Sequence, residues 1–394
     1  MSIADKLNNI VETKGLIKQA IIDKGVQVSD SDNFRSYADK INSIKGGPDE
    51  YIPLSVDSNG ILVKTGTEWN TSATDLSSTV LQYAFNGVST LTSASLNNLT
   101  KVSGTRALNY AFARCSNLSS LTFGPITEIG QNAMNAMCYA CPNLTSINLS
   151  SLISIAGGGM SSAFEGCTNL KTVNLNNLTN LQGYSAMRST FQGTGITSIS
   201  LPKLSTLGDG NGLQDTFKNC TSLVSASLDG LVTISNGSYA LGNTFEGCTS
   251  LTSLSIKNLK SITEDAYDYN LTCLCKNCTS LTSVDISGLE TINGFGVLDS
   301  AFEGCTSLKS LSFTSLVNVG NSFTNTFRNC NGLHLYFPAL VESSLEKEYY
   351  FSDMLGGATD CTVHFPASLQ PILSTWTSVT NGFSGTNSTI LFDL

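Results

Sequence analysis

One pattern recurs along most of the chain and constrains the fold more than any other feature. From about residue 80 the sequence repeats Phe-x-Gly/Asn-Cys-Thr/Ser-Ser/Asn-Leu-x-Ser-Leu-x-Leu-x-x-Leu-x-x-Ile, most clearly from 164, 245 and 302 onward. Successive copies lie 25 to 30 residues apart. Near-matches at one period predict stacked structural units rather than separate globular domains. The Phe position is occupied by Phe85, Phe112, Cys138, Phe164, Phe191, Phe217, Phe245, Cys275, Phe302 and Phe327.

A period near 27 residues that carries Leu-x-x-Leu-x-Leu favours a solenoid of the leucine-rich-repeat kind. Each turn should contribute one short strand such as 253–256, in which Leu254 and Ile256 point inward and the serines point outward. A brief helical turn around 301–305 is expected opposite the strand, with its Phe and Cys side chains filling the core. The sequence therefore predicts a mostly β repeat solenoid of about 11 turns over residues 81–394.

The Ala-Phe-x-x-Cys-x-x-Leu core of these units, complete at 301–308, resembles the BspA-like leucine-rich repeat family. The likeness covers about residues 80–370 and implies a leucine-rich-repeat fold. The units of this chain are longer than those of the family, because extra residues stand between the Ile and the next Phe. The resemblance also implies a role in adhesion at a bacterial surface.

The N-terminal segment is a different kind of sequence. Residues 1–50 hold 15 of the 51 charged residues, and Gly46-Gly47-Pro48 breaks the chain near the boundary. Apolar residues at three- and four-residue steps predict two amphipathic helices, and so small a hairpin buries too little surface to be stable by itself. We expect residues 1–48 to be a helical hairpin that docks, oligomerises or only caps the solenoid, and residues 49–80 to form a capping region. The apolar docking stripe consists of Leu7, Ile10, Ile17, Ile21, Phe34, Tyr37 and Ile41.

This segment resembles short N-terminal regions of bacteriophage tail and fibre proteins. The likeness covers about 45 residues and implies attachment to other virion proteins. It lies in Ile17-Lys18-x-Ala20-Ile21, Lys24-Gly25-Val26-x-Val28 and Phe34-x-x-Tyr37-Ala38-x-Lys40-Ile41.

Composition argues against several classes of function. The chain has two histidines, His334 and His364, which we expect at exposed strand positions, and no recognisable spacing ties a carboxylate or nucleophile to either. A net charge of −9 argues against nucleic-acid binding. Carboxylate pairs such as Asp265/Asp268 are interpreted as isolated loop charges, with a glycosidase pair as the alternative. No apolar run is long enough for a membrane span, no signal peptide is recognised, and no cofactor is expected.

Ten of the twelve cysteines fall on repeat core positions, which predicts small, buried, reduced thiols. The CxxC spacings Cys138/Cys141 and Cys275/Cys278 would suit zinc, but five turns separate the two pairs, too far for one tetrahedral site. We expect no metal. A disulfide near Cys273 is the other alternative.

Two surfaces are candidates for binding. The outward strand columns are nearly all Ser, Thr or Asn and predict either a solvated sheet or a flat contact surface for a polysaccharide. The segments between repeats differ from one another and are rich in Gly, Asn, Ser and Tyr, as adaptable binding loops are, although tolerated insertions would look the same. Gly157–Gly159 is interpreted as a plain loop. The candidate receptor-contact residues are Tyr184, Arg188, Tyr239, Tyr267, Tyr269 and Phe295.

The sequence favours a non-enzymatic virion component, a phage tail or fibre protein whose solenoid contacts a polysaccharide or protein of a bacterial surface. A phage protein is made in a reducing host cytoplasm and released by lysis, which fits many thiols without a signal peptide. The first alternative is a BspA-like adhesin, on a bacterial surface or outside the cell, that binds host or matrix proteins. The second alternative is a glycan-active enzyme.

Overall fold

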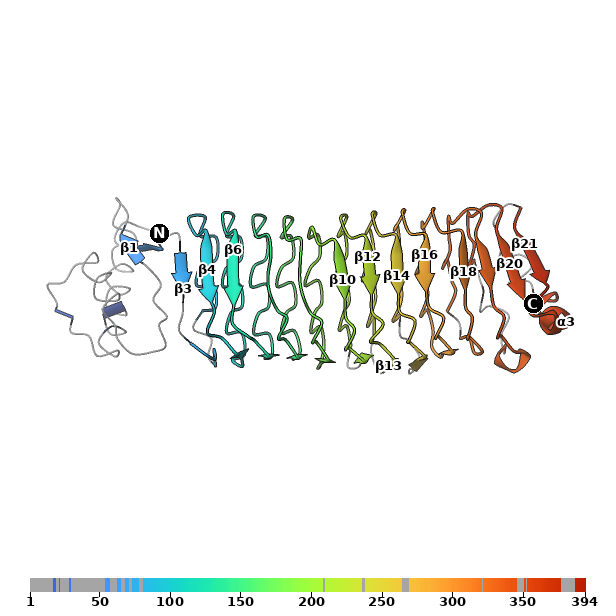
Figure 1. Cartoon of the computed structure of the whole chain (residues 1–394), viewed down its shortest axis with the longest axis horizontal. Coiled ribbons are helices and arrows are strands. Elements are labelled where there is room, and N and C mark those ends of the chain that lie inside the picture. Colours follow the sequence, from blue (N-terminus) through green and yellow to red (C-terminus); the bar gives the residue numbers. More distant parts are fainter. Residues whose placement is uncertain are drawn as a thin grey trace, which may run out of the picture.

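The chain winds into a solenoid whose coils stack side by side along one long axis, in the order of the sequence (Figure 1). The computed structural model describes residues 17–18, 21, 28–29, 54–56, 62–64, 68–70, 73–77, 81–207, 210–235, 238–263, 269–320, 322–345, 351, 353–376 and 387–394. The expected fold class, a leucine-rich-repeat solenoid, is confirmed.

Most coils begin with a short strand, and these strands pair in parallel, in three groups, to form the first strand row. Between β6 and β10 the row continues only as an isolated bridge from Ser146 to Thr172. The register is strict, because Ser225 faces Ser253, which in turn faces Ser283. β3 pairs with β4, so the row reaches back into residues 49–80, and β21 follows the last unit expected from the sequence. The row contains β3 (Glu68–Asn70), β4 (Ser93–Leu96), β6 (Ser120–Phe123), β10 (Ser198–Ser200), β12 (Ser225–Ser227), β14 (Ser253–Ser255), β16 (Ser283–Asp285), β18 (Ser310–Ser312), β19 (His334–Tyr336), β20 (Thr362–Phe365) and β21 (Thr389–Phe392).

A second strand row follows a tight turn in each coil. It is also parallel, as Thr233 facing Ser261 and Ser261 facing Thr291 show. Its strands are very short, because one inward residue such as Ile234 is enough to reach the core. The row contains β5 (Lys101–Val102), β7 (Glu128–Ile129), β8 (Ser154–Ile155), β9 (Asn180–Leu181), β11 (Thr206–Leu207), β13 (Thr233–Ser235), β15 (Ser261–Thr263) and β17 (Thr291–Ile292).

The third side of each coil, called here the turn face, corrects one expectation. We expected a helical turn around 301–305, but that stretch is a run of hydrogen-bonded turns. Every fourth residue of such a run has positive φ, as at Asp215, Asn219 and Gly247. The N–H groups of such a run alternate between two acceptors. One N–H donates to the carbonyl three residues earlier in the same coil, and the next donates to a carbonyl of the following coil, as from Phe217 N to Thr244 O at 2.9 Å. This pattern satisfies the backbone without a helix, and Asn, Asp and Gly tolerate its left-handed residues best.

The core contains a column of stacked phenylalanine rings, as the repeat predicts. Phe164, Phe191, Phe217 and Phe245 stack in sequence with centroids 5.6 to 5.7 Å apart, and all four are fully buried. The column is interrupted where Cys138 takes the Phe position. Within each uninterrupted stretch every ring contacts the ring of the next coil, so the phenylalanines couple neighbouring coils to each other.

The repeat cysteines form a second inner column. The Cys248 thiol donates to the carbonyl of Phe217 at 3.1 Å, and the Cys278 thiol donates to that of Phe245 at 3.0 Å. The cysteine therefore has two roles, because it fills a small core position and satisfies a buried carbonyl of the preceding coil.

Few other elements are described. β1 (Leu54–Val56) and β2 (Leu62–Lys64) form an antiparallel pair. Near the C-terminus lie the short helices η1 (Glu342–Ser344), η3 (Ala367–Leu369) and α3 (Gln370–Leu373). No helix in the described part of the chain has the length and apolar character that crossing a membrane requires.

The docking stripe is described in part. Ile17 and Ile21 are helical, and Ile21 is buried. Leu7, Ile10, Phe34, Tyr37 and Ile41 lie outside the described residues. The helical hairpin therefore stays a prediction.

Candidate functional site

The outer surface of the first strand row is polar and shallow. Its outward side chains are small, as at Ser253 and Ser255, and they border an open hollow of about 640 Å³ that spans β10 to β16. Asp285 is its one charged lining residue among those described. With neither an aromatic side chain nor Arg in this hollow, the face lacks the anchors that concentrate binding energy.

The segments between repeats meet at one edge of the solenoid, called here the variable corner. It comprises residues 131–135, 156–161, 182–188, 210–212, 238–240, 269 and 293–296, which lie between the second strand row and the turn face of their coils. Because successive coils hydrogen-bond to each other here, as from Gly158 N to Tyr184 O at 2.8 Å, segments that are far apart in sequence hold fixed relative positions.

Three of the candidate receptor-contact residues come together in the variable corner. The rings of Tyr239 and Tyr269 stack at 5.3 Å, and Phe295 contacts Tyr269 edge-on at 6.4 Å. The ring of Tyr269 lies over Gly296, where any side chain would collide with it. Because the rings bury each other's faces, this cluster supports the corner as well as exposing aromatic surface. Tyr267 lies outside the described residues.

A carboxyl group lies beside this cluster. Asp299 accepts a hydrogen bond from the N–H of Thr324 at 3.2 Å. Burial outweighs that bond and raises the pKa of Asp299 to about 6.

Tyr184 is separate from the aromatic cluster and is the most exposed large hydrophobic side chain among the described residues of the corner. It is 71% exposed, and its ring lies over Gly210 of the next coil. Arg188 is also exposed, four residues further along the same coil. The structure therefore divides the predicted residues into a packed cluster and a free tyrosine with a nearby arginine.

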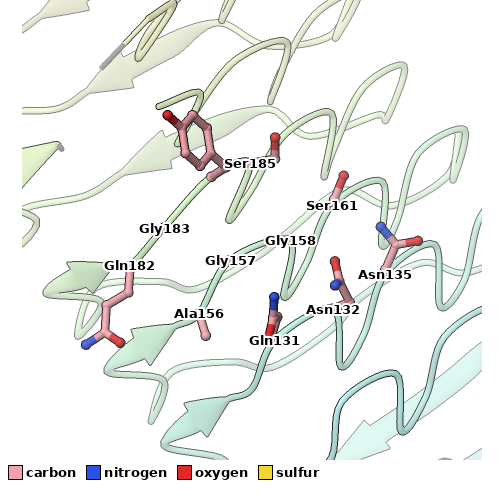
Figure 2. Close-up of a pocket in the computed structure, with 11 residues that line it drawn as sticks. Gln131, Asn132, Asn135, Ala156, Gly157, Gly158, Ser161, Gln182, Gly183 and Ser185 are labelled. Carbon is pink, nitrogen blue, oxygen red and sulfur yellow. The ribbon is translucent and has the colours of Figure 1, made fainter. Parts of the chain in front are cut away.

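A pocket of about 640 Å³ opens beside Tyr184. Figure 2 shows its labelled residues on neighbouring turns of the chain. Its glycines include Gly157 and Gly158, which the sequence had suggested were only a loop. The pocket is lined by Gln131, Asn132, Asn135, Ala156, Gly157, Gly158, Ser161, Gln182, Gly183, Tyr184 and Ser185.

The sequence analysis missed most of these residues. The available signal was positional, since Gln131, Gly157 and Gly183 follow one another at steps of 26 residues, which places them side by side in three coils. Elsewhere in the coils, asparagine amides join neighbouring coils through hydrogen bonds. Asn143 Nδ2, for example, donates to Ser116 O at 2.8 Å, and Asn177 Nδ2 donates to Ser150 O at 2.8 Å.

The two histidines correct another expectation. His334 is exposed as predicted, but His364 is half-buried, because its ring stacks on Tyr336 at 4.4 Å. No recognisable spacing ties a carboxylate to either histidine, yet in the folded chain His364 Nδ1 lies 2.9 Å from Asp393 Oδ1. The partner is 29 residues away, about one coil further on, so β20 and β21 bring the two side chains together. With one imidazole and one carboxylate against an aromatic ring, the pair joins the last two coils.

The cysteines show no metal-site geometry. All twelve are free thiols, and the described residues contain no group of three His, Cys, Asp or Glu side chains that could hold a metal ion. Burial raises the pKa of Cys220 and of Cys273 to about 11 and that of Cys330 to about 12. Since the thiolate is the metal ligand and the nucleophile, these groups are unreactive near neutral pH.

Comparison with protein families gives one match. The model of the BspA type leucine rich repeat region matches this chain in six copies over residues 78–224, 134–274 and 272–356. The matching description is that of a repeat region, and no catalytic family is indicated. A search of curated proteins gives no match.

Solved structures similar to this chain are leucine-rich-repeat proteins. A leucine-rich repeat protein from Bacteroides ovatus is 19% identical, with 78% of this chain and 86% of that chain covered and a TM-score of 0.33. One from T. pallidum is 18% identical, with coverage of 67% and 91% and a TM-score of 0.27. The Toll–Spatzle complex of Drosophila contains a chain 16% identical, with coverage of 70% and 48% and a TM-score of 0.26.

Proposed function

The chain belongs to the BspA-type leucine-rich repeat family, and on that premise we propose that it is a non-enzymatic recognition protein of a virion. Its solenoid contacts a polysaccharide or protein receptor on a bacterial surface, and residues 1–48 attach it to other virion proteins or to further copies of itself. The chain is made in the host cytoplasm and acts in the phage tail or fibre.

The proposal that the solenoid binds a receptor rests on the variable corner. Its segments differ from coil to coil in sequence, whereas the strand rows and the core repeat. A rigid scaffold with one variable edge is the arrangement that recognition proteins use, because the scaffold fixes the loops before the partner arrives. The exposed Tyr184 supplies an anchor of the type that binding sites favour.

The virion half rests on the N-terminal resemblance and on the composition of residues 1–48. That segment has its own apolar stripe and its own charge density, and the hydrophobic core found among the described residues of the solenoid runs from Ala73 to Trp376. A detachable helical hairpin of this size is stable when it packs on a partner.

Truncation and substitution of the N-terminal segment test receptor binding and virion attachment separately. A truncated chain that starts at Pro48 should stay folded and still bind host cells, but it should no longer join a particle or a higher oligomer. In the full chain, Leu7→Asp or Ile41→Asp should also abolish assembly, because a charge on the apolar stripe exceeds the stability margin of so small a hairpin. Sedimentation reports assembly and labelled-cell pull-down reports binding.

Three results would change the proposal. If truncation unfolds the solenoid, the hairpin is a cap. If truncation removes cell binding while assembly survives, the two roles are exchanged. If the full chain binds host matrix proteins and no bacterial cells, the chain is an adhesin of the BspA-like kind, on a bacterial surface or secreted.

A further inference from the structure

We propose that the pocket beside Tyr184 binds one uncharged sugar unit of a glycan. This inference rests on the proposed function, because the sugar would belong to the bacterial surface receptor. It names a binding site within the variable corner and the class of ligand that the site takes.

The lining residues have no formal charge. Among the described residues that border the pocket, the polar groups are amides and hydroxyls, and none is Asp, Glu, Lys or Arg. An anionic group such as a phosphate would find no cation there, and a metal ion would find no carboxylate. A neutral ligand with many hydroxyl groups needs neither a cationic nor an anionic side chain, because it binds through hydrogen bonds.

Four amide side chains surround the pocket, from Gln131, Asn132, Asn135 and Gln182. In the described chain none of these side chains makes a hydrogen bond to another residue, in contrast to Asn143, whose amide joins two coils. An amide has one acceptor and two donor positions, so it suits a hydroxyl group, which both donates and accepts. The pocket therefore presents unused hydrogen-bonding capacity of the type that sugar hydroxyls satisfy.

Tyr184 supplies the apolar contact. The C–H groups on one face of a pyranose ring form a flat apolar surface, and an aromatic ring packs against it. Tyr184 is 71% exposed at the edge of the pocket. Its ring covers Gly210 of the next coil on one side, and its exposed part is available for such a contact, whereas the rings of Tyr239 and Tyr269 are stacked on each other. A phenol ring beside a set of amides combines these two requirements.

The glycines supply room and rigidity. Gly158 has φ +64° and lies under the Asn132 side chain, so a larger residue there would displace that amide. The three coils are joined by backbone hydrogen bonds, including Asn132 N to Gly157 O at 3.0 Å, which fixes the floor of the pocket. Coils about 4.8 Å apart give the pocket a width of roughly 10 Å, which is wide enough for one sugar ring.

The probe is a panel of purified uncharged bacterial polysaccharides with glucose, galactose or N-acetylhexosamine repeats, together with a teichoic acid as the anionic control. Saturation-transfer NMR and calorimetry on the full chain measure binding. We expect an uncharged polysaccharide to bind, and we expect about a tenfold or greater loss of affinity in Tyr184→Ala and in Gln131→Ala/Gln182→Ala. These three side chains are exposed, so their removal leaves the fold intact.

Two further variants sharpen the result. Gly157→Leu fills the pocket, and its first side-chain atom fits because the nearest backbone atom is 3.5 Å away. It should abolish binding with an unchanged melting temperature. The matched control is Arg106→Ala, which removes an exposed charge on the coil next to Gln131 but outside the pocket lining, and it should leave affinity within about twofold, with little dependence on salt.

Several outcomes would overturn the inference. Binding of the teichoic acid alone, with loss in Arg188→Ala and at high salt, would mean an acidic ligand. Failure of every uncharged polysaccharide, or affinity unchanged in Tyr184→Ala and Gly157→Leu, would mean that the pocket is not the site. If whole-cell binding survives in these variants, the proposed function stands without the pocket, whereas a full chain that binds no cells refutes the function itself.

Discussion

The stacked core predicts that two equally buried phenylalanines differ in their contribution to stability. Phe191 stacks on Phe164 at 5.7 Å and on Phe217 at 5.6 Å, and the ring planes deviate by 4° and 8°. Phe245 stacks on Phe217 at 5.7 Å, but Cys275 takes the Phe position of the next coil. Phe191 therefore has an aromatic neighbour on each side, and Phe245 has one in its column.

The magnitude follows from two contributions. Replacing a buried Phe by Ala costs about 3–5 kcal/mol through lost burial and the cavity left behind. Each aromatic pair contributes about 0.5–1.5 kcal/mol beyond burial. Both Phe191→Ala and Phe245→Ala should therefore be strongly destabilising, with Phe191→Ala the more costly by about 0.5–1.5 kcal/mol.

The assay must resolve single coils, because solenoid repeats couple mainly to their neighbours. Native-state hydrogen exchange at rising urea, read by mass spectrometry, follows inter-coil amides such as Phe191 N, which donates to Thr216 O at 2.9 Å. Phe191→Leu serves as the control, since it keeps most of the volume and loses only the ring contacts. A loss below about 0.5 kcal/mol for either Ala variant, or a larger loss at Phe245, would refute the stacked-column account.

Four more predictions follow from single contacts. Cys273 is the least buried of the twelve thiols and should react first with a thiol reagent. Because its pKa is raised to about 11, its rate of labelling at pH 8 should still be about a hundredfold below that of an exposed cysteine. Equally fast labelling of most thiols would contradict the buried column. Asp299 has a pKa of about 6 in the folded chain and 3.8 as a free side chain, so the free energy of unfolding falls as pH rises between these values. Asp299→Asn should therefore raise the Tm at pH 8 and leave it unchanged at pH 3. An equal shift at both pH values would exclude titration as the cause. His364→Ala should speed hydrogen exchange of the β21 amides by removing the partner of Asp393, and unchanged exchange would mean that this pair does not hold the last strand. Gly288→Ala, whose methyl would meet the Lys257 carbonyl oxygen, should cost about 1–3 kcal/mol in urea unfolding, whereas Gly157→Ala should cost under about 0.5 kcal/mol.

The sequence was sufficient for the solenoid itself. Its period, the Phe and Cys columns and the inward Leu254 all follow from one rule, because a position that is buried in one coil is buried in every coil. The repeat therefore reports the same environment many times, and single exceptions such as Cys138 do not obscure it. The outward direction of Ser253 and Ser255 follows from the two-residue period of a strand.

The turn face shows where local pattern was insufficient. The residues around Phe302 have the spacing of a short helix, yet Ser300 and Gly304 have positive φ and the segment bonds to the next coil instead. Hydrogen bonds between coils supply the partners that a helix would find within itself. Whether the segment forms a helix or bonds to the next coil depends on the neighbouring coils, so the sequence of a single repeat does not determine it.

The candidate site depends on the stack in the same way. Gln131, Gly157 and Gly183 are each unremarkable residues of irregular segments, and His364 and Asp393 are 29 residues apart. The 26-residue steps place Gln131, Gly157 and Gly183 in neighbouring coils, but they do not show which side chains are left without partners or that Tyr184 borders the same pocket. The backbone ladder of the strand rows fixes the offset between neighbouring coils, and only that offset brings four amides and Tyr184 around one pocket.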